Sequence, residues 1–255
     1  MADPESQDQE LSFLEHLVEL RSRLLKACLA ILIVLLVLLP FSRKLYAWLA
    51  APLTSVLPEG SSMIAIDVAS PFLTPFKLAL LLALILSIPF VLYQLWAFVA
   101  PALYRQEKRL ARPLLYSSVV LFYAGCAFAY FVVFPLVFGF FTRVAPEGVT
   151  VMTDISKYLD FVMTLFLAFG ITFEVPIATI ILVATGMTSI EQLGRIRPYV
   201  LVGAFALGML LTPPDVISQT LLALPMWLLF ELGVLMARIL LPHRRESKPE
   251  EPGEE

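Results

Sequence analysis

Two long charge-free runs constrain this chain more than any other feature of its sequence. They cover residues 78–104 and 113–142, and a short cluster of arginine and lysine separates them. Each run exceeds the roughly 20 apolar residues that a helix needs to cross a bilayer. In lipid a helix satisfies its backbone polar groups internally, whereas in a soluble domain such a run would need burial on every side. The sequence therefore predicts an all-α protein that crosses a membrane several times.

Composition supports this prediction and argues against a water-soluble enzyme core. Hydrophobic residues make up 59% of the chain and charged residues 15%, whereas soluble domains have an apolar share of about 45–50%. Cys28 and Cys126 lie in apolar runs with neither CxxC spacing nor neighbouring histidines, so we expect no metal or redox site. No segment has the pattern of a nucleotide-binding loop. We expect no cofactor and no nucleic-acid partner.

Six membrane spans can be drawn through the apolar segments. Their approximate bounds are residues 24–40, 78–104, 113–142, 161–189, 198–211 and 216–237. With the N-terminus inside, every basic residue falls in an inside segment except Arg43, Lys44, Lys77, Arg143 and Lys157. The positive-inside rule then predicts that both termini are cytoplasmic. We expect a cytoplasmic segment over residues 1–23, a six-helix transmembrane domain over residues 24–237 and a disordered cytoplasmic tail over residues 238–255.

The segment before the first span has the pattern of a helix start. Ser12 and Glu15 fit a capping box, and apolar residues then recur at helical spacing. This pattern predicts an amphipathic helix that lies along the inner membrane surface and then turns into the bilayer. The preceding segment is long and acidic, so the first span is expected to be permanent rather than a cleaved signal peptide.

The fifth and sixth spans are predicted to be short. Pro213 and Pro214 end the fifth helix, so residues 198–214 rise only about 26 Å, less than the roughly 30 Å hydrocarbon core. Asp215 follows as the expected N-cap of the sixth helix. Met209 and the polar residues Thr212 and Gln219 lie near the outer ends of these helices, where uncharged polar groups usually hold helices together. The outside loop over residues 41–77 is proline-rich and is expected to form an ordered cap.

Two glutamates at the predicted cytoplasmic surface leave two interpretations open. Glu19 has Arg23 one helical turn away, and Glu107 lies among Arg105, Lys108 and Arg109. In the structural interpretation each carboxylate neutralises its basic neighbours. In the functional interpretation Glu19 and Glu107 together receive a cationic ligand, because carboxylates hold guanidinium groups by paired, charge-assisted hydrogen bonds.

Two further glutamates fall within the spans. Glu174 lies near mid-membrane, where a charge costs on the order of 2.5–3.5 kcal/mol, and Pro176 loosens the helix at the same depth. Glu174 is expected either to be a protonated acid bonding a neighbouring helix or to take part in proton or substrate passage. Glu231 lies nearer the inner surface, and we expect it to snorkel or to pair with Arg238.

Five motifs in order resemble those of the TatC family, the membrane receptor subunits of the bacterial twin-arginine translocase. The motifs are HLVELR at residues 16–21, FVAPALY at 98–104, FEVP at 173–176, RPY at 197–199 and LTPPD at 211–215. The resemblance covers nearly the whole chain. It implies a concave, lipid-open fold in the bacterial cytoplasmic membrane. It also implies transport of folded proteins bearing twin-arginine signal peptides, driven by the proton motive force, with several copies of the chain assembling with the single-span partners TatA and TatB.

The resemblance also implies roles for particular residues. Glu19, Phe98 and Glu107 would form the signal-peptide site, with Glu107 the principal acceptor for the arginine pair. Glu174 would face the concave side of the fold. Pro52 and Asp215 would support assembly or transport. The partner-helix site would comprise Met209, Thr212 and Gln219.

The residues argue against two other classes of function. A proton-coupled small-molecule transporter would use Glu174 as its relay, but the two halves of the chain show no repeat of the kind that many such transporters have. An intramembrane enzyme would need a nucleophile with a base or a metal site, and the only histidines, His16 and His243, lie outside the spans. We therefore expect a protein that is not an enzyme.

Overall fold

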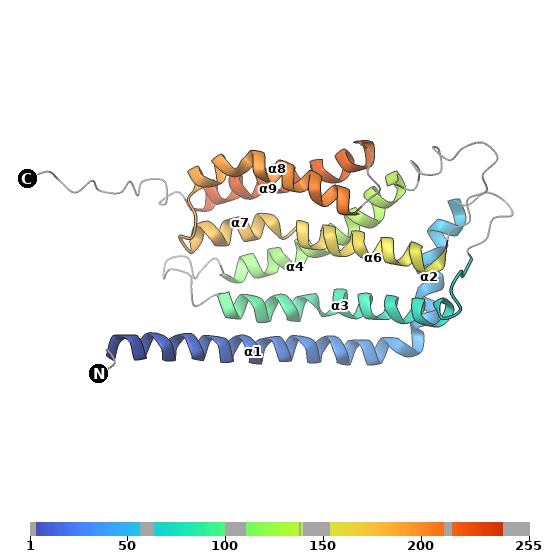
Figure 1. Cartoon of the computed structure of the whole chain (residues 1–255), viewed down its shortest axis with the longest axis horizontal. Coiled ribbons are helices and arrows are strands. Elements are labelled where there is room, and N and C mark those ends of the chain that lie inside the picture. The colour runs from blue at the N-terminus through green and yellow to red at the C-terminus, as the bar shows by residue number, and fades with distance from the viewer. Residues whose placement is uncertain are drawn as a thin grey trace, which may run out of the picture. The chain divides into compact units, whose positions relative to one another are not determined.

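The computed structural model describes residues 4–56, 64–99, 111–137, 139, 154–211 and 216–241. These parts of the chain are helical, apart from turns and one isolated bridge between Ile64 and Asp154. The α-helices, in chain order and as drawn in Figure 1, are α1 (Pro4–Leu38), α2 (Ser42–Val56), α3 (Ser70–Val99), α4 (Ala111–Phe128), α6 (Ile155–Thr172), α7 (Val175–Ala184), α8 (Ile190–Leu211) and α9 (Val216–Leu240). The 3-10 turn η1 (Leu39–Phe41) follows α1, and the π-helical segment η4 (Ala129–Val133) follows α4.

Six helical segments are long and apolar enough to cross a membrane. They are Leu17–Leu49, Ser70–Val99, Arg112–Val137, Ile155–Ala184, Ile190–Leu211 and Gln219–Leu240. The predicted all-α architecture with six spans is confirmed for the described residues. The last two segments have 22 residues each and the others 26 to 33, so the fifth and sixth spans are indeed the short ones. The sides on which the termini lie and the concave architecture stay predictions.

The first span differs from its prediction. Residues 4–38 form one helix of 35 residues, so the expected turn between a surface helix and a membrane helix does not occur there. Ser12 lies inside this helix and therefore does not cap it. The physical reason is that residues 5–38 contain neither proline nor glycine, so no residue interrupts the helical hydrogen bonds. At about 1.5 Å per residue, α1 is roughly 20 Å longer than the hydrocarbon core.

The fifth span also begins earlier than predicted. Ser189 and Gln192 form a capping box: the Ser189 Oγ accepts from the Gln192 N–H at 3.1 Å, and the Gln192 Oε1 accepts from the Ser189 N–H at 2.9 Å. Helix α8 therefore starts at Ile190, and Pro198 lies within it. The whole helix is about 33 Å long, but its first two turns are charged. The apolar part from Pro198 to Leu211 is only about 21 Å long.

The fourth span is interrupted where its glutamate lies, as predicted. Helix α6 ends at Thr172, a turn contains Phe173 and Glu174, and α7 starts at Val175. Because Pro176 has no N–H, the Thr172 carbonyl loses its helical donor. The regular helix is thus interrupted beside Glu174, the carboxylate in the middle of this span.

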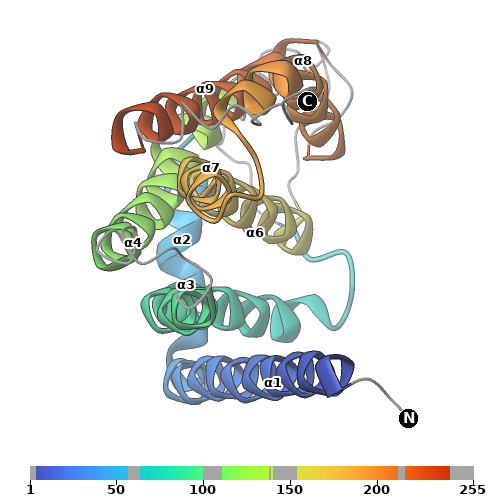
Figure 2. The ribbon, with the colours of Figure 1, turned by 90° about the vertical axis from the view of Figure 1, so that its left-hand side faces the viewer.

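The chain divides into two compact units, and each is described by itself. The first unit contains residues 1–101 and 142–164, and the second contains residues 102–141 and 165–255. In the first unit α1 and α2 both pack against α3. Figures 1 and 2 both draw α1 beside α3. Leu35 near the end of α1 packs with Ala79 and Ala83 near the start of α3, so the two helices run antiparallel.

In the second unit α9 packs against both α7 and α8. Gly233 allows the close approach to α7, because a Cβ there would lie 2.8 Å from the Pro176 Cα and 3.0 Å from the Thr179 Cβ. The pairing of α4 with the second half of α6 is aromatic. The Phe128 ring lies 5.4 Å from Phe169, centroid to centroid. Small and aromatic residues therefore provide the packing that holds these helices together.

The contact at Gly233 makes a stability prediction. We expect Gly233→Ala to lower the free energy of unfolding by about 1–3 kcal/mol, because the added methyl group meets backbone atoms that cannot rotate away. Gly203→Ala in α8 is the matched control, since a Cβ there meets nothing within 4 Å. Both variants gain the same helix propensity. Thermal unfolding in detergent measures the difference, and equal midpoints for the two variants would contradict the packing described here.

Candidate functional site

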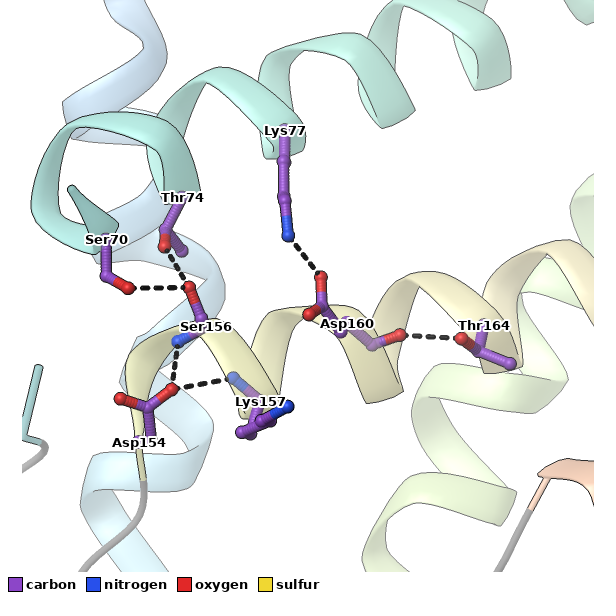
Figure 3. A network of polar contacts seen from close by, with 8 residues as sticks. All are labelled: Ser70, Thr74, Lys77, Asp154, Ser156, Lys157, Asp160 and Thr164. Carbon is purple, nitrogen blue, oxygen red and sulfur yellow. Dashed lines mark hydrogen bonds and ion pairs between the residues drawn. The ribbon is translucent and has the colours of Figure 1, made fainter. Parts of the chain in front are cut away.

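A polar network joins α3 to α6 at the end of the first unit where both helices begin (Figure 3). The Ser156 Oγ donates to the Ser70 Oγ at 3.1 Å and shares a hydrogen bond of 2.9 Å with the Thr74 Oγ1. One turn further along each helix, Lys77 Nζ donates to Asp160 Oδ1 at 2.8 Å. These contacts link two helices that are more than 80 residues apart in sequence.

Asp154 is the N-cap of α6 and also holds a distant segment. Its Oδ1 accepts from the N–H groups of Ser156 and Lys157, both at 2.9 Å. Its Oδ2 accepts from the Ile66 N–H at 3.0 Å. These backbone donors, led by that of Ile66, lower the pKa of the Asp154 carboxyl, because they stabilise its charged form.

The sequence analysis did not single out this network. An aspartate directly before an apolar helical run is an N-cap signal and could have identified Asp154. The cross-helix partners Ser70 and Thr74 carry no such signal. The network joins two segments that the predicted topology places on the same side of the membrane. Because its polar groups bond mainly to one another, we interpret it as a structural clamp rather than a substrate site.

Glu19 is engaged by its own helix. Both the Nε and Nη2 of Arg23 donate to the Glu19 Oε1, at 2.9 and 2.5 Å. The Glu19 side chain remains 38% exposed. An exposed pair of this kind contributes about 0–1 kcal/mol. Glu19 therefore binds the guanidinium group of Arg23, and this interaction is weak.

Phe98 lies at the same level of the first unit as Glu19. Leu35 packs beside Ala79 and Ala83, and α1 and α3 run antiparallel. Glu19 lies about 24 Å from this contact along α1. Ala97, the neighbour of Phe98, lies about 24 Å from it in the same direction along α3. The structure thus brings these two predicted residues to one end of the unit, opposite the polar clamp.

Four of the predicted residues lie partly or wholly outside the described part of the chain. Glu107, Thr212 and Asp215 fall outside the described residues altogether. Pro52 lies within α2, but its side chain is not described. The predictions made for these four residues therefore remain predictions.

Glu174 bonds a neighbouring helix, as one of its two interpretations expected. The Ser118 Oγ of α4 donates to the Glu174 Oε2 at 2.6 Å. Ser118 is buried, and the other glutamate oxygen, Oε1, is buried without a hydrogen-bond partner in the described structure. No sequence pattern marked Ser118, because the adjacent Ser117 and Ser118 point in different directions on a helix and only packing decides which of them meets Glu174.

Gln219 joins the two short spans within the chain. Its Nε2 donates to the Phe205 carbonyl oxygen on α8 at 2.8 Å. Gly208 allows this approach, since a Cβ there would lie 3.2 Å from the Gln219 Cγ. Met209, one residue further along α8, has an exposed side chain. Gln219 thus links α9 to α8 by a hydrogen bond, while the exposed side chain of Met209 can contact a neighbouring helix.

The prediction that Glu231 pairs with Arg238 is wrong. Its Oε2 accepts from Arg197 Nη2 on α8 at 2.8 Å, rather than from Arg238 on its own helix. Arg238 is seven residues further along α9, two turns away, whereas packing of α8 against α9 places Arg197 opposite Glu231. Tertiary packing therefore decides the pair.

Comparison with known proteins assigns the chain to a family. The family model described as Sec-independent protein translocase protein (TatC) matches residues 15–225. The chain belongs to the TatC family. It is similar to the Sec-independent protein translocase protein TatC of Haemophilus influenzae, with 58% identity over 94% of each chain. The TatC of Escherichia coli strain K12 is 59% identical over 91% of this chain and 90% of its own.

A solved TatC structure has the same fold. The crystal structure of the twin-arginine translocase receptor TatC superposes with a TM-score of 0.78 and 37% identity, covering 88% of this chain and 98% of that one. The resemblance read from the five motifs is therefore confirmed. With its six apolar spans, this TatC family member is a multi-pass membrane protein. Its relatives are named as components of protein transport rather than of catalysis.

The Asp154 cap predicts a pH-dependent stability. Its pKa in the folded chain lies below the unfolded value of about 3.9. Its contribution to stability is therefore complete above that value and is lost as the pH falls through the lowered pKa. We expect Asp154→Ala to lower the thermal midpoint at pH 7, and the difference from the native chain to shrink below about pH 4. Asp67→Ala, at an exposed position, is the control; an equal loss in both variants would refute the capping role.

The Ser118–Glu174 hydrogen bond predicts a coupling energy. In a double-mutant cycle of Ser118→Ala and Glu174→Ala, we expect a coupling of about 0.6–1.7 kcal/mol, because either single change leaves a polar group without its partner. Unfolding in detergent or bicelles measures each corner of the cycle. Additive single changes would show that the two side chains do not interact.

Proposed function

We propose that this chain is the receptor component of a twin-arginine translocase in the bacterial cytoplasmic membrane. It binds signal peptides that carry two consecutive arginines. With the single-span proteins TatA and TatB, and with further copies of itself, it transports folded proteins using the proton motive force. Its membership of the TatC family supports this proposal.

The observation that carries the binding step is the Glu19–Arg23 contact. A single oxygen of Glu19 accepts two N–H groups of the Arg23 guanidinium, and such charge-assisted hydrogen bonds are the means by which a carboxylate binds an arginine. Because the pair is partly exposed, an arriving arginine can replace Arg23 at little cost in free energy. Arg23 thus occupies the place that a signal-peptide arginine would take.

Phe98 and Glu107 complete the proposed site. Phe98 lies level with Glu19, and the segment that contains Glu107 leaves α3 at this same end of the helix. Two guanidinium groups require two carboxylates, and we assign Glu107 as the principal acceptor with Glu19 as the second. Phe98 offers an aromatic face for an arginine side chain or for the apolar part of the peptide.

The remaining residues receive roles in assembly and transport. We assign Glu174 to the polar side of the fold at mid-membrane. Met209, Thr212 and Gln219 form the proposed contact for a partner helix, and Pro52 and Asp215 support assembly. The exposed Met209 side chain fits this role. Gln219 also bonds Phe205, so its contribution there includes holding the two short spans together.

Binding of a labelled twin-arginine signal peptide to the purified chain tests the site. We expect the twin-arginine peptide to bind more tightly than its twin-lysine counterpart, and Glu107→Ala to weaken binding by about tenfold or more, because a charge-assisted pair contributes about 1.5–3 kcal/mol. Glu191→Ala, an exposed glutamate in the first turn of α8, is the matched control and should leave binding unchanged.

A second arm of this experiment separates Glu19 from a general charge effect. Arg23→Gln removes the competing guanidinium, so we expect tighter peptide binding, whereas Glu19→Gln should weaken it. Weaker binding in the Arg23→Gln variant would mean that the ion pair itself supports the site. Equal binding of the two peptides by the folded native chain would refute the proposed receptor site.

A further inference from the structure

A groove in the second unit has a chemistry that the proposed function does not use. It has a volume of about 380 Å³ and lies along α8 and α9, which run side by side in Figure 1. Its lining includes Arg197, Glu231, Arg238, Leu228, Leu232 and Leu235. Three charged side chains and three leucines thus line the same groove, so it is amphiphilic.

The charges in the groove are not balanced. Two guanidinium groups, of Arg197 and Arg238, face one carboxylate, that of Glu231. The ion pair between Arg197 and Glu231 uses one nitrogen and one oxygen, Nη2 and Oε2 at 2.8 Å. The Arg197 Nε and the Glu231 Oε1 are both buried without a hydrogen-bond partner in the described structure. A buried N–H donor and a buried acceptor therefore remain to be satisfied beside an excess positive charge.

The groove lies at the boundary between hydrocarbon and headgroups. The apolar part of α8 begins at Pro198, directly after Arg197, and Arg238 lies in the last turn of α9. From there Leu235, Leu232 and Leu228 follow one face of α9 toward the membrane interior, and each is 42–52% exposed. A ligand seated on the arginines would thus have an apolar track of about 10 Å leading away from it.

We propose that this groove binds an anionic glycerophospholipid through its phosphate. The phosphate oxygens accept from the Arg197 Nε and the Arg238 guanidinium, which matches the excess positive charge. The Glu231 Oε1 accepts a hydroxyl of the headgroup, as the glycerol of phosphatidylglycerol supplies. One acyl chain lies along the three leucines. This inference stands independently of the signal-peptide site, which is formed by other residues, Glu19, Phe98 and Glu107.

The amphiphilic lining favours a lipid over a free phosphate ion. A phosphate ion would use the arginines but leave the exposed leucines to the surrounding lipid. A zwitterionic lipid would bring its own positive charge to a groove that already has an excess of one. Basic grooves between membrane helices are a recurring way of binding anionic headgroups.

Native mass spectrometry of the full chain in detergent tests the proposal. Dioleoyl-phosphatidylglycerol and dioleoyl-phosphatidylcholine are titrated separately, so the acyl chains are the same. We expect tighter retention of phosphatidylglycerol, and Arg238→Gln to weaken it about fivefold, the value of one arginine near an anionic headgroup. Arg195→Gln is the matched control, because it removes the same charge from an exposed position on α8 outside the groove.

The outcomes separate a built site from diffuse attraction. A loss in Arg238→Gln with no loss in Arg195→Gln supports the site, as does partial recovery in Arg238→Lys. Equal losses in both glutamine variants, or no preference for phosphatidylglycerol by the native chain, would overturn it. Loss of the preference for phosphatidylglycerol in millimolar inorganic phosphate would show an ion site only and would overturn the proposal. If Arg238→Gln does not fold, Arg238→Lys and the phosphatidylglycerol-induced shift in thermal midpoint decide in its place.

Discussion

Hydrocarbon offers no hydrogen-bond partner, and the arrangement of polar side chains in this protein follows from that constraint. Helices satisfy the backbone within each span. A polar side chain at depth bonds either a carbonyl of its own helix, as Thr179 bonds Val175, or a partner on another helix. Ser118 reaches Glu174 from α4, Gln219 reaches the Phe205 carbonyl on α8, and Arg197 pairs with Glu231 on α9. These three contacts join helices that apolar packing alone would leave free to slide, because lipid tails are as apolar as the leucines that face them.

The two ends of α3 have different chemistry, and this difference separates structure from proposed recognition. At its start, Ser70, Thr74 and Lys77 are bound to α6. Near its end, Phe98 lies level with Glu19, whose local pair with Arg23 is partly exposed. A self-satisfied network gives rigidity but offers nothing to a ligand. A weakly paired carboxylate can exchange its partner, which is what the proposed recognition of an incoming arginine requires.

Arginine and carboxylate meet twice in the described structure with different consequences. Glu19 and Arg23 are four residues apart on one helix, so their contact survives any movement between helices. Arg197 and Glu231 belong to different helices and leave a buried nitrogen and a buried oxygen without partners. The first arrangement suits exchange with an external arginine. The second arrangement, with Arg238 beside it, suits a phosphate at the membrane interface, where the apolar part of α8 is only about 21 Å long.

The sequence by itself determined the six spans, the break at Glu174 and the relative shortness of the last two spans, because hydropathy, proline and helix length act locally along the chain. It also identified Glu19 as a residue with Arg23 within reach. Helix starts were less well determined: residues 4–38 continue as one helix, and a capping box at Ser189 begins α8 before Pro198. Only the tertiary structure decided that Glu231 pairs with Arg197, that Glu174 bonds Ser118 and that Asp154 holds Ile66. Partners from distant segments depend on how helices pack and rotate against one another, which local patterns do not encode.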